Sequence, residues 1–252
     1  MHGYHRARFN DPDAARQHLE ALRWPEGPFC PHCGSFNATR LPAQRGRPTK
    51  AHPEGAIRSG VIQCNDCREQ YSVTVGTVFE SSKIGLHKWV LATFLLCSSK
   101  RGISGHQLAR MLGVTQKTAW FMSHRIREAM RPVEGEPPLG GEGKATTFYT
   151  DDAGQYRHMN RDFTHEVVNH GKDEYVRGKA HTNTVEGYFS ILKRGITGTY
   201  YHLSAEHLHR YCVEFDFRYN TRKENDFERC SQALKGIYGR RLTYRRADQI
   251  AA

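Results

Sequence analysis

Two acidic residues and a lysine in the second half of the chain have a spacing that suits metal-dependent chemistry on nucleic acid. Residues 149–152, Tyr-Thr-Asp-Asp, read as a short strand that ends in carboxylates, among them Asp151. Glu186 falls in a stretch with helical periodicity, and Lys193 follows two turns later, about 10 Å away along the same side. Carboxylate oxygens are the ligands that Mg²⁺ prefers. The combination suggests a metal-dependent nuclease or transposase.

The stretch around Glu186 has the pattern of an amphipathic helix, with its apolar and polar residues on different faces. The apolar stripe consists of Val185, Tyr188, Phe189 and Leu192. The polar face consists of Asn183, Glu186, Ser190 and Lys193. We therefore expect this helix to pack through its apolar stripe and to present the acid and the lysine together.

Several segments of the chain resemble the bacterial insertion-sequence transposases that combine an N-terminal zinc ribbon, a helix-turn-helix and a DDE-type RNase H-like catalytic domain. The resemblance extends from about residue 14 to 225 and is most specific over residues 181–200. The matching segments are Val-Asn-His-Gly-Lys-Asp-Glu-Tyr-Val-Arg-Gly (168–178), His-Thr-Asn-Thr-Val-Glu-Gly (181–187), Leu-Lys-Arg-Gly-Ile (192–196) and Glu-Phe-Asp-Phe-Arg-Tyr-Asn (214–220).

The resemblance implies roles for individual residues. Asp151 and Glu186 would be catalytic acids that hold Mg²⁺ or Mn²⁺, and Lys193 would contact a substrate phosphate or the terminal base. Some relatives use Asn in the third acidic position, so Asn183 is a rival to Glu186. Two plainer interpretations stay open: a turn at Asp151, since Asp-Asp-Ala-Gly is good turn chemistry, and an ordinary solvated helix residue at Glu186.

The resemblance breaks just before Asp151. In the family, a first Asp that bridges two metal ions follows a few residues after a segment like Gly-Gly-Glu-Gly-Lys (140–144). Here that segment runs straight into the strand bearing Asp151, so the first three strands, the first helix and the bridging Asp are missing. A two-ion site is then incomplete, and the one predicted strand has no sheet to join. Asp152 and Glu142 are the first candidates for a replacement ligand.

Two Cys-x-x-Cys pairs near the N-terminus indicate a structural zinc ion. Each tight turn directs two sulfurs toward one point, which suits tetrahedral coordination. Residues 40–60 between the pairs are rich in Pro, Gly and Arg and predict a basic surface insertion within a zinc ribbon. The predicted ligands are Cys30, Cys33, Cys64 and Cys67.

A helix, a tight turn and a second helix are predicted over residues 104–112, 113–115 and 116–130. The helix-turn-helix interpretation makes the second helix the recognition helix. Its first residues would then reach base edges and its later basic residues would contact phosphates. The alternative is a helical hairpin with a solvated charged face. The predicted DNA contacts are Gln116, Lys117, Thr118 and Arg125.

Composition agrees with a polyanionic partner. The chain has 252 residues with 37 Lys and Arg against 26 Asp and Glu, a net charge of +11. No apolar run is long enough to span a bilayer, and the N-terminus lacks an apolar signal core. We therefore expect a cytoplasmic, nucleoid-associated protein with double-stranded DNA as its partner and no membrane contact. A homo-oligomer is compatible with the sequence.

These patterns predict an α+β multidomain protein with a zinc ribbon, a helical helix-turn-helix segment and an incomplete RNase H-like α/β fragment. The predicted divisions are residues 1–80 for the zinc ribbon with a short N-terminal helix, 81–131 for the helix-turn-helix segment, 132–146 for a linker, 147–225 for the truncated RNase H-like domain and 226–252 for a basic tail.

Three functions fit this organisation. The first is a transposase relative that binds transposon-end DNA and has lost strand transfer. The second is a non-enzymatic DNA-binding regulator of its parent element. The third is an active nuclease whose missing ligand comes from another chain. The carboxylate count favours the first two.

Overall fold

A computed structural model describes residues 6–50, 53–132, 147–161, 164–172, 176–178 and 180–243. The chain divides into two compact units, the first formed by residues 1–131 together with 203–252 and the second by residues 132–202. Almost all of the linker predicted at 132–146, including Glu142, lies outside the described residues.

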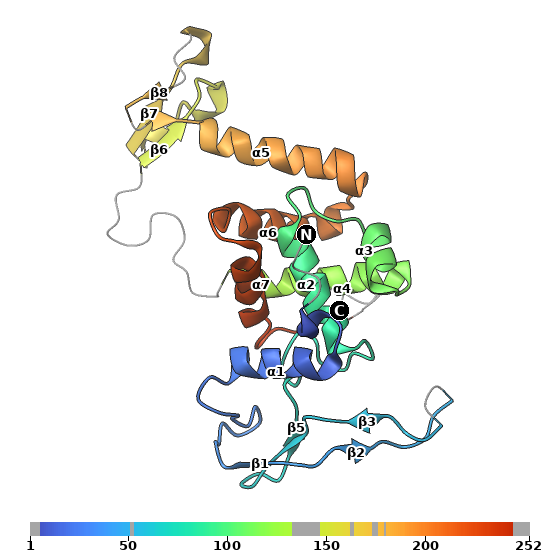
Figure 1. The fold of residues 1–252 in the computed structure, drawn as a ribbon. Coiled ribbons are helices and arrows are strands. Elements are labelled where there is room, and N and C mark those ends of the chain that lie inside the picture. Colours follow the sequence, from blue (N-terminus) through green and yellow to red (C-terminus); the bar gives the residue numbers. More distant parts are fainter. Residues whose placement is uncertain are drawn as a thin grey trace, which may run out of the picture. The chain divides into compact units, whose positions relative to one another are not determined.

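The zinc-ribbon part of the first unit contains two small antiparallel sheets (Figure 1). In the three-stranded sheet, the central strand β4 pairs with β1 and β5, and a separate ladder joins β2 to β3. The strands are β1 (Ala38–Arg40), β2 (Gln44–Arg45), β3 (Ile57–Arg58), β4 (Ile62–Cys64) and β5 (Gln70–Tyr71). The β2–β3 hairpin is the basic insertion predicted between the two cysteine pairs.

The helices of the first unit begin where the sequence offers caps. Asp11 accepts backbone hydrogen bonds at the start of α1, and Pro12 occupies its first turn. Asn225 and Glu228 form a reciprocal capping box at the start of α7. The helices are α1 (Pro12–Arg23), α2 (Leu86–Ser98), α3 (Gly105–Leu112), α4 (Gln116–Ala129), α6 (Ala205–Asn220) and α7 (Asp226–Lys235).

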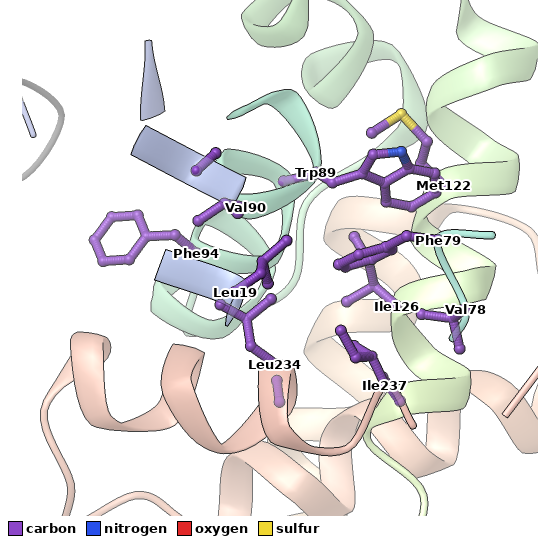
Figure 2. Close-up of a cluster of buried hydrophobic side chains, with 14 of the residues drawn as sticks. Leu19, Val78, Phe79, Trp89, Val90, Phe94, Met122, Ile126, Leu234 and Ile237 are labelled. Atoms are coloured by element: carbon purple, nitrogen blue, oxygen red, sulfur yellow. The ribbon is translucent and has the colours of Figure 1, made fainter. Parts of the chain in front are cut away.

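Helix α2 is the centre of the hydrophobic core, as its apolar sequence predicts. It packs against α1, α3, α4 and α7. Figure 2 shows side chains from these elements converging, with Leu19 from α1, Phe94 from α2 and Leu234 from α7. All three are at most 5% exposed. Burying such side chains stabilises the fold by about 1.5–3 kcal/mol each.

The C-terminal segment corrects the predicted divisions. Residues 226–235 form α7, whose Cys230, Ala233 and Leu234 lie in the core, so this part is not a frayed basic tail. Helix α6 packs against α4 in the first unit, although it was assigned to the RNase H-like domain. Helix α7 belongs to the core because burial of its apolar residues against α2 stabilises the fold more than solvation of its charged residues would.

The second unit contains more strands than expected. Strand β6 (Thr147–Thr150) pairs in parallel with β7 (Thr164–Val167), and β8 (Val176–Arg177) pairs antiparallel with β9 (Ala180–His181). The prediction of a lone strand is therefore wrong. The sequence did contain evidence for β7, namely the β-branched residues Thr164, Val167 and Val168, which are typical of a strand. Each described sheet of this unit still has only two strands.

Helix α5 (Asn183–Gly195) follows β9 directly and runs into a π-helical turn, Ile196–Tyr200. Its predicted apolar stripe is incompletely covered, since Val185 and Phe189 are each 48% exposed. The expectation that this helix packs through its apolar stripe is therefore met only in part. Among the described residues, no helix is long and apolar enough to cross a membrane.

Candidate functional site

The four cysteines of the two pairs converge on one point in the ribbon. Their sulfurs all lie within 4.8 Å of one another, with Cys30 to Cys67 at 3.6 Å and Cys33 to Cys64 at 3.5 Å. A tetrahedral ion with Zn–S bonds of about 2.3 Å needs sulfurs roughly 3.8 Å apart, so the cluster fits zinc.

The local backbone explains how two distant pairs make one site. In each pair the residue after the second cysteine, Gly34 or Arg68, has a positive φ, which folds the knuckle back on itself. Backbone N–H groups then point at the sulfurs. Hydrogen bonds from the Cys67 and Asp66 backbone lower the pKa of the Cys64 thiol to about 7. These groups favour the thiolate, which is the form that binds metal.

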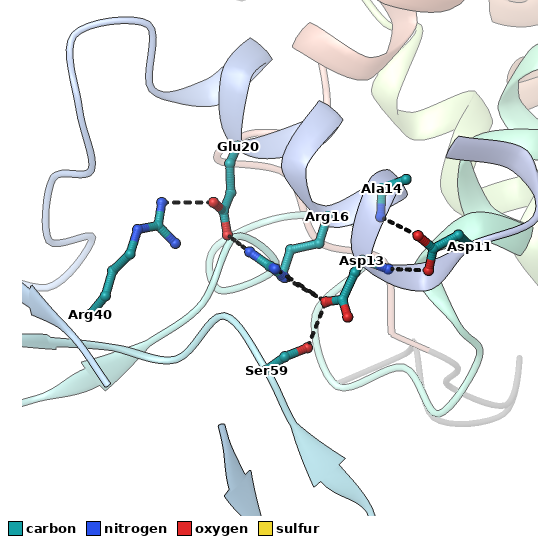
Figure 3. Close-up of polar contacts among 7 residues, drawn as sticks. All are labelled: Asp11, Asp13, Ala14, Arg16, Glu20, Arg40 and Ser59. Carbon is teal, nitrogen blue, oxygen red and sulfur yellow. Dashed lines mark hydrogen bonds and ion pairs between the residues drawn. The ribbon is translucent and has the colours of Figure 1, made fainter. Parts of the chain in front are cut away.

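Polar contacts fasten the ribbon to α1 (Figure 3). The Arg40 guanidinium lies 2.7 Å from the Glu20 carboxylate, which also pairs with Arg16 at 2.9 Å. On the other side, the Ser59 hydroxyl donates to Asp13 at 2.9 Å. Since Arg40 and Ser59 flank the β2–β3 hairpin, these bonds fix its base to the helix.

The helix-turn-helix geometry is present in α3 and α4. Ser104 caps α3, and Gly113 ends it in the left-handed conformation, with φ of 60°. Thr115 then caps α4 by accepting from the Thr118 backbone. Gln116 and Lys117, in the first turn of α4, are exposed. The first turn therefore presents an amide and an ammonium to solvent, as a recognition helix requires.

Arg125 corrects the predicted DNA contacts. It is only 6% exposed, and its guanidinium donates to the Glu80 carbonyl at 2.7 Å and lies over the Trp89 ring. A buried arginine held by a carbonyl is not available to a phosphate. Arg125 joins α4 to the segment before α2, which is a structural role.

The other basic residues in the second half of α4 are also buried, because α6 covers this part of the helix. Arg127 pairs with Glu214 at 2.6 Å, and Glu214 pairs with Arg218 at 3.1 Å. His124 is fully buried, and burial, followed by the charge of Arg127, lowers its pKa to about 2. The ring is therefore neutral at physiological pH. Only the first turn of α4 keeps the predicted recognition role.

This buried ionic group was missed in the sequence. Glu214 and Arg218 are four residues apart, a spacing that brings them together on one helix face. Their neighbours Tyr211 and Phe215 are apolar and buried. A carboxylate and an arginine on an apolar helix face could have predicted a buried ion pair, because such charges are rarely buried without a partner.

The described acidic residues of the second unit do not form a metal site with a third ligand. Asp151 follows β6 and accepts from the Ala153 backbone at 3.2 Å, which is the turn considered as its alternative role. Glu186 lies in the first turn of α5 and accepts from the Thr182 hydroxyl. Asn183 and Lys193 are exposed on the same helix.

In the part of the chain that the structure describes, the cysteine cluster is the only group of three or more potential metal ligands close enough to share an ion. Asp152 does not complete a site with Asp151 or Glu186. The described carboxylates therefore do not fit a pair of catalytic Mg²⁺ or Mn²⁺ ions.

A four-cysteine ribbon, a helix-turn-helix and a unit with parallel strands and acidic residues define a protein of the transposase class. Two family models match the chain: a transposase zinc-ribbon domain over residues 10–70 and an ISXO2-like transposase domain over residues 142–220. The chain belongs to the insertion-sequence transposases. The predicted resemblance and the α+β multidomain class are confirmed, and the zinc-ribbon match supports a structural zinc ion at the four cysteines.

The chain is also similar to a Halobacterium salinarum protein described as an uncharacterized protein in transposable element ISH50. The two are 24% identical over 255 aligned positions, which cover 71% of this chain and 81% of the relative. Since 71% of 252 residues is about 179, some 76 of the 255 positions have no residue in this chain. No solved structure matches the chain.

Proposed function

We propose that this transposase binds the ends of its parent element through the first turn of α4 and no longer performs strand transfer. The exposed pair Gln116 and Lys117 carries the first half of the proposal. The amide of a glutamine can bond to a base edge, and the ammonium of a lysine can contact a phosphate. Thr118 is half-buried, and its hydroxyl lies 2.8 Å from that of Thr115, so it supports the helix start.

The missing carboxylate carries the second half of the proposal. The relative has about 76 positions without a counterpart here, and we place most of them between Lys144 and the strand bearing Asp151. That gap is where the first metal-bridging Asp of the family would fall. Among the described residues, no third ligand joins Asp151 and Glu186 within reach of one ion, and this supports the proposal because two ions need several oxygen ligands.

DNA binding at the element ends can be tested with Lys117→Ala. Loss of one phosphate contact should weaken binding to a duplex carrying the ends and reduce the salt slope of log K by about 1, because fewer counterions are released. Titration at several salt concentrations measures both quantities. Lys235→Ala, which removes an exposed charge from α7, is the matched control and should leave the slope nearly unchanged. Equal affinity for the ends and for random duplex would reduce the claim to nonspecific attraction.

The loss of catalysis predicts no metal-dependent cutting. With Mg²⁺ or Mn²⁺ and labelled end duplexes, we expect the chain to give no more cleaved product than its Glu186→Ala variant. A relative that retains the additional positions serves as the active control. Cleavage by the chain that Glu186→Ala removes would refute the proposal and favour a site completed by another chain.

Binding without cutting makes the chain a regulator of its parent element as well as a relic. A protein that occupies the ends prevents an intact transposase from reaching them. This second role needs no residue beyond the exposed first turn of α4, and it predicts inhibition of an intact relative when both are present.

A further inference from the structure

The hairpin that interrupts the zinc ribbon has features that the helix-turn-helix does not explain. We call residues 41–58 the arm. Its sequence has four arginines and lysines and one acidic residue, Glu54. Arg45, Arg47 and Lys50 are all exposed. Strands β2 and β3 extend away from β1 and β5 (Figure 1). The exposed basic side chains are therefore accessible to a large anionic partner.

The base of the arm is held firmly. Arg40 and Ser59, at its two ends, bond to Glu20 and Asp13 of α1 (Figure 3). Beyond them, the Gly46 backbone N–H donates to the Ala56 carbonyl at 2.8 Å and continues the β2–β3 ladder. A preorganised hairpin loses less conformational freedom when it binds a ligand than a free loop does.

Residues 45–48 read Arg-Gly-Arg-Pro, and each residue type has a physical consequence. Arg45 belongs to strand β2, and Pro48 restricts Arg47 to extended conformations. Arginines two positions apart on an extended backbone lie about 6.6 Å apart on one face, close to the length of two base-pair steps, about 6.8 Å. Gly46 between them lets the two sides of the hairpin approach closely, because a Cβ at this position would lie 3.3 Å from the Ala56 carbonyl oxygen.

We propose that residues 45–48 insert into the minor groove of A·T-rich duplex DNA, with Arg45 and Arg47 donating to the base acceptors on its floor. The minor groove is only about 6 Å wide, and A·T pairs show only acceptors there, whereas G·C pairs add the guanine N2 amino donor. Two guanidinium groups match the acceptors and oppose the donor. A-tracts also narrow the groove and strengthen its negative potential, which attracts arginine.

Two further observations suit this partner. Arg45 pairs with Glu54 at 3.1 Å, but both side chains are exposed, so the pair is weak and can give way to DNA. Ile57, opposite Arg45 in the ladder, is 67% exposed and offers an apolar surface to the sugars that wall the groove. The contact adds to the DNA-binding function proposed above, from which it takes its partner, but it uses different residues and a different groove.

Inosine substitution tests the groove directly. Inosine·cytosine pairs have the minor-groove face of A·T but the major-groove face of G·C, because inosine lacks the N2 amino group. We expect the full chain with zinc bound to prefer A·T and inosine·cytosine duplexes over G·C by roughly 5- to 100-fold. Arg47→Ala should remove most of this preference. Equal affinity for inosine·cytosine and G·C duplexes would overturn the proposal.

Two variants separate the arm from other contributions. Lys50→Ala removes one charge from the same arm, and it should weaken binding to all three duplexes without changing their ratio. Lys117→Ala in α4 should behave in the same way if the helix contacts DNA elsewhere. If Arg47→Ala keeps the ratio of affinities for the three duplexes, the minor-groove role of the arm is refuted, but DNA binding by α4 is not. If Lys117→Ala leaves the affinity unaltered, DNA binding by α4 is refuted, but the role of the arm is not. Unchanged zinc content verifies that each variant is folded.

Discussion

Replacing Cys64 with serine is expected to abolish zinc binding and unfold the ribbon. Cys64 is fully buried, and its sulfur lies among three others that together suit one tetrahedral ion. Structural zinc contributes about 10–16 kcal/mol of apparent binding free energy in small domains, so losing it should cost the ribbon several kcal/mol of stability. Metal analysis of the purified chain should give one zinc ion per wild-type molecule and almost none for the variant.

The effect should extend beyond the metal ligands. Cys30 and Cys64 belong to the same buried cluster as Trp24 and Tyr71, whose rings meet edge to face at 5.9 Å. Opening the ribbon therefore exposes the end of α1. Cys212→Ser is the matched control, because it removes a half-buried thiol outside the cluster and should retain zinc. Full zinc content in Cys64→Ser would contradict the assigned ligand set.

The parts of the fold that the sequence predicted are those set by local chemistry. Ser104 at a helix start and Gly113 at a turn act within a few residues of their own position, so the helix-turn-helix could be located from its pattern. The two cysteine pairs were equally readable. Each pair forms its own turn, and the pairing of β1 with β4, which lie next to the two turns, brings the turns together.

Features that depend on distant partners could not be read in this way. Arg125 looked like a phosphate contact because a helix sequence gives no indication that Glu80 and Trp89 enclose its side chain. Arg240 in the supposed tail donates to the carbonyls of Glu128 and Ala129 and so caps the end of α4. In both cases a basic residue satisfies backbone groups of another element, which a charge count cannot distinguish from a DNA contact.

The acids of the second unit illustrate a different limit. Both Asp151 and Glu186 lie where the pattern placed them, at a strand end and in the first turn of a helix. Their chemistry depends on a third ligand, which the pattern cannot supply. Thr182 and the Ala153 backbone instead meet part of their hydrogen-bonding capacity. Correct positions for individual residues therefore did not amount to a site.

The buried charges between α4 and α6 provide the second large effect. Glu214 is 0% exposed and accepts from Arg127 of α4 and Arg218 of its own helix, while the Arg127 guanidinium also lies 3.9 Å from the centre of the Tyr211 ring. Arg127 also donates to the Ser123 hydroxyl and Arg218 to the Ser99 carbonyl, but Glu214 is the carboxylate that balances the charge of both arginines. Removing it leaves positive charge in a site that water does not reach.

Glu214→Ala should therefore lower the free energy of unfolding by about 3–5 kcal/mol, the usual cost of breaking a buried ion pair from one side. Denaturant titration of the variant and the wild type measures the difference. Because α6 covers α4, DNA binding should weaken in parallel, even though Glu214 does not touch the first turn of α4, where Lys117 lies. Glu206→Ala, which removes an exposed acid from the same helix, is the control and should change stability by less than about 0.5 kcal/mol.

Replacing Arg127, Glu214 and Arg218 together with apolar residues should recover most of the lost stability, because no unpaired charge then stays buried. A cost below about 1 kcal/mol for Glu214→Ala would show that α6 does not dock on α4 through these charges.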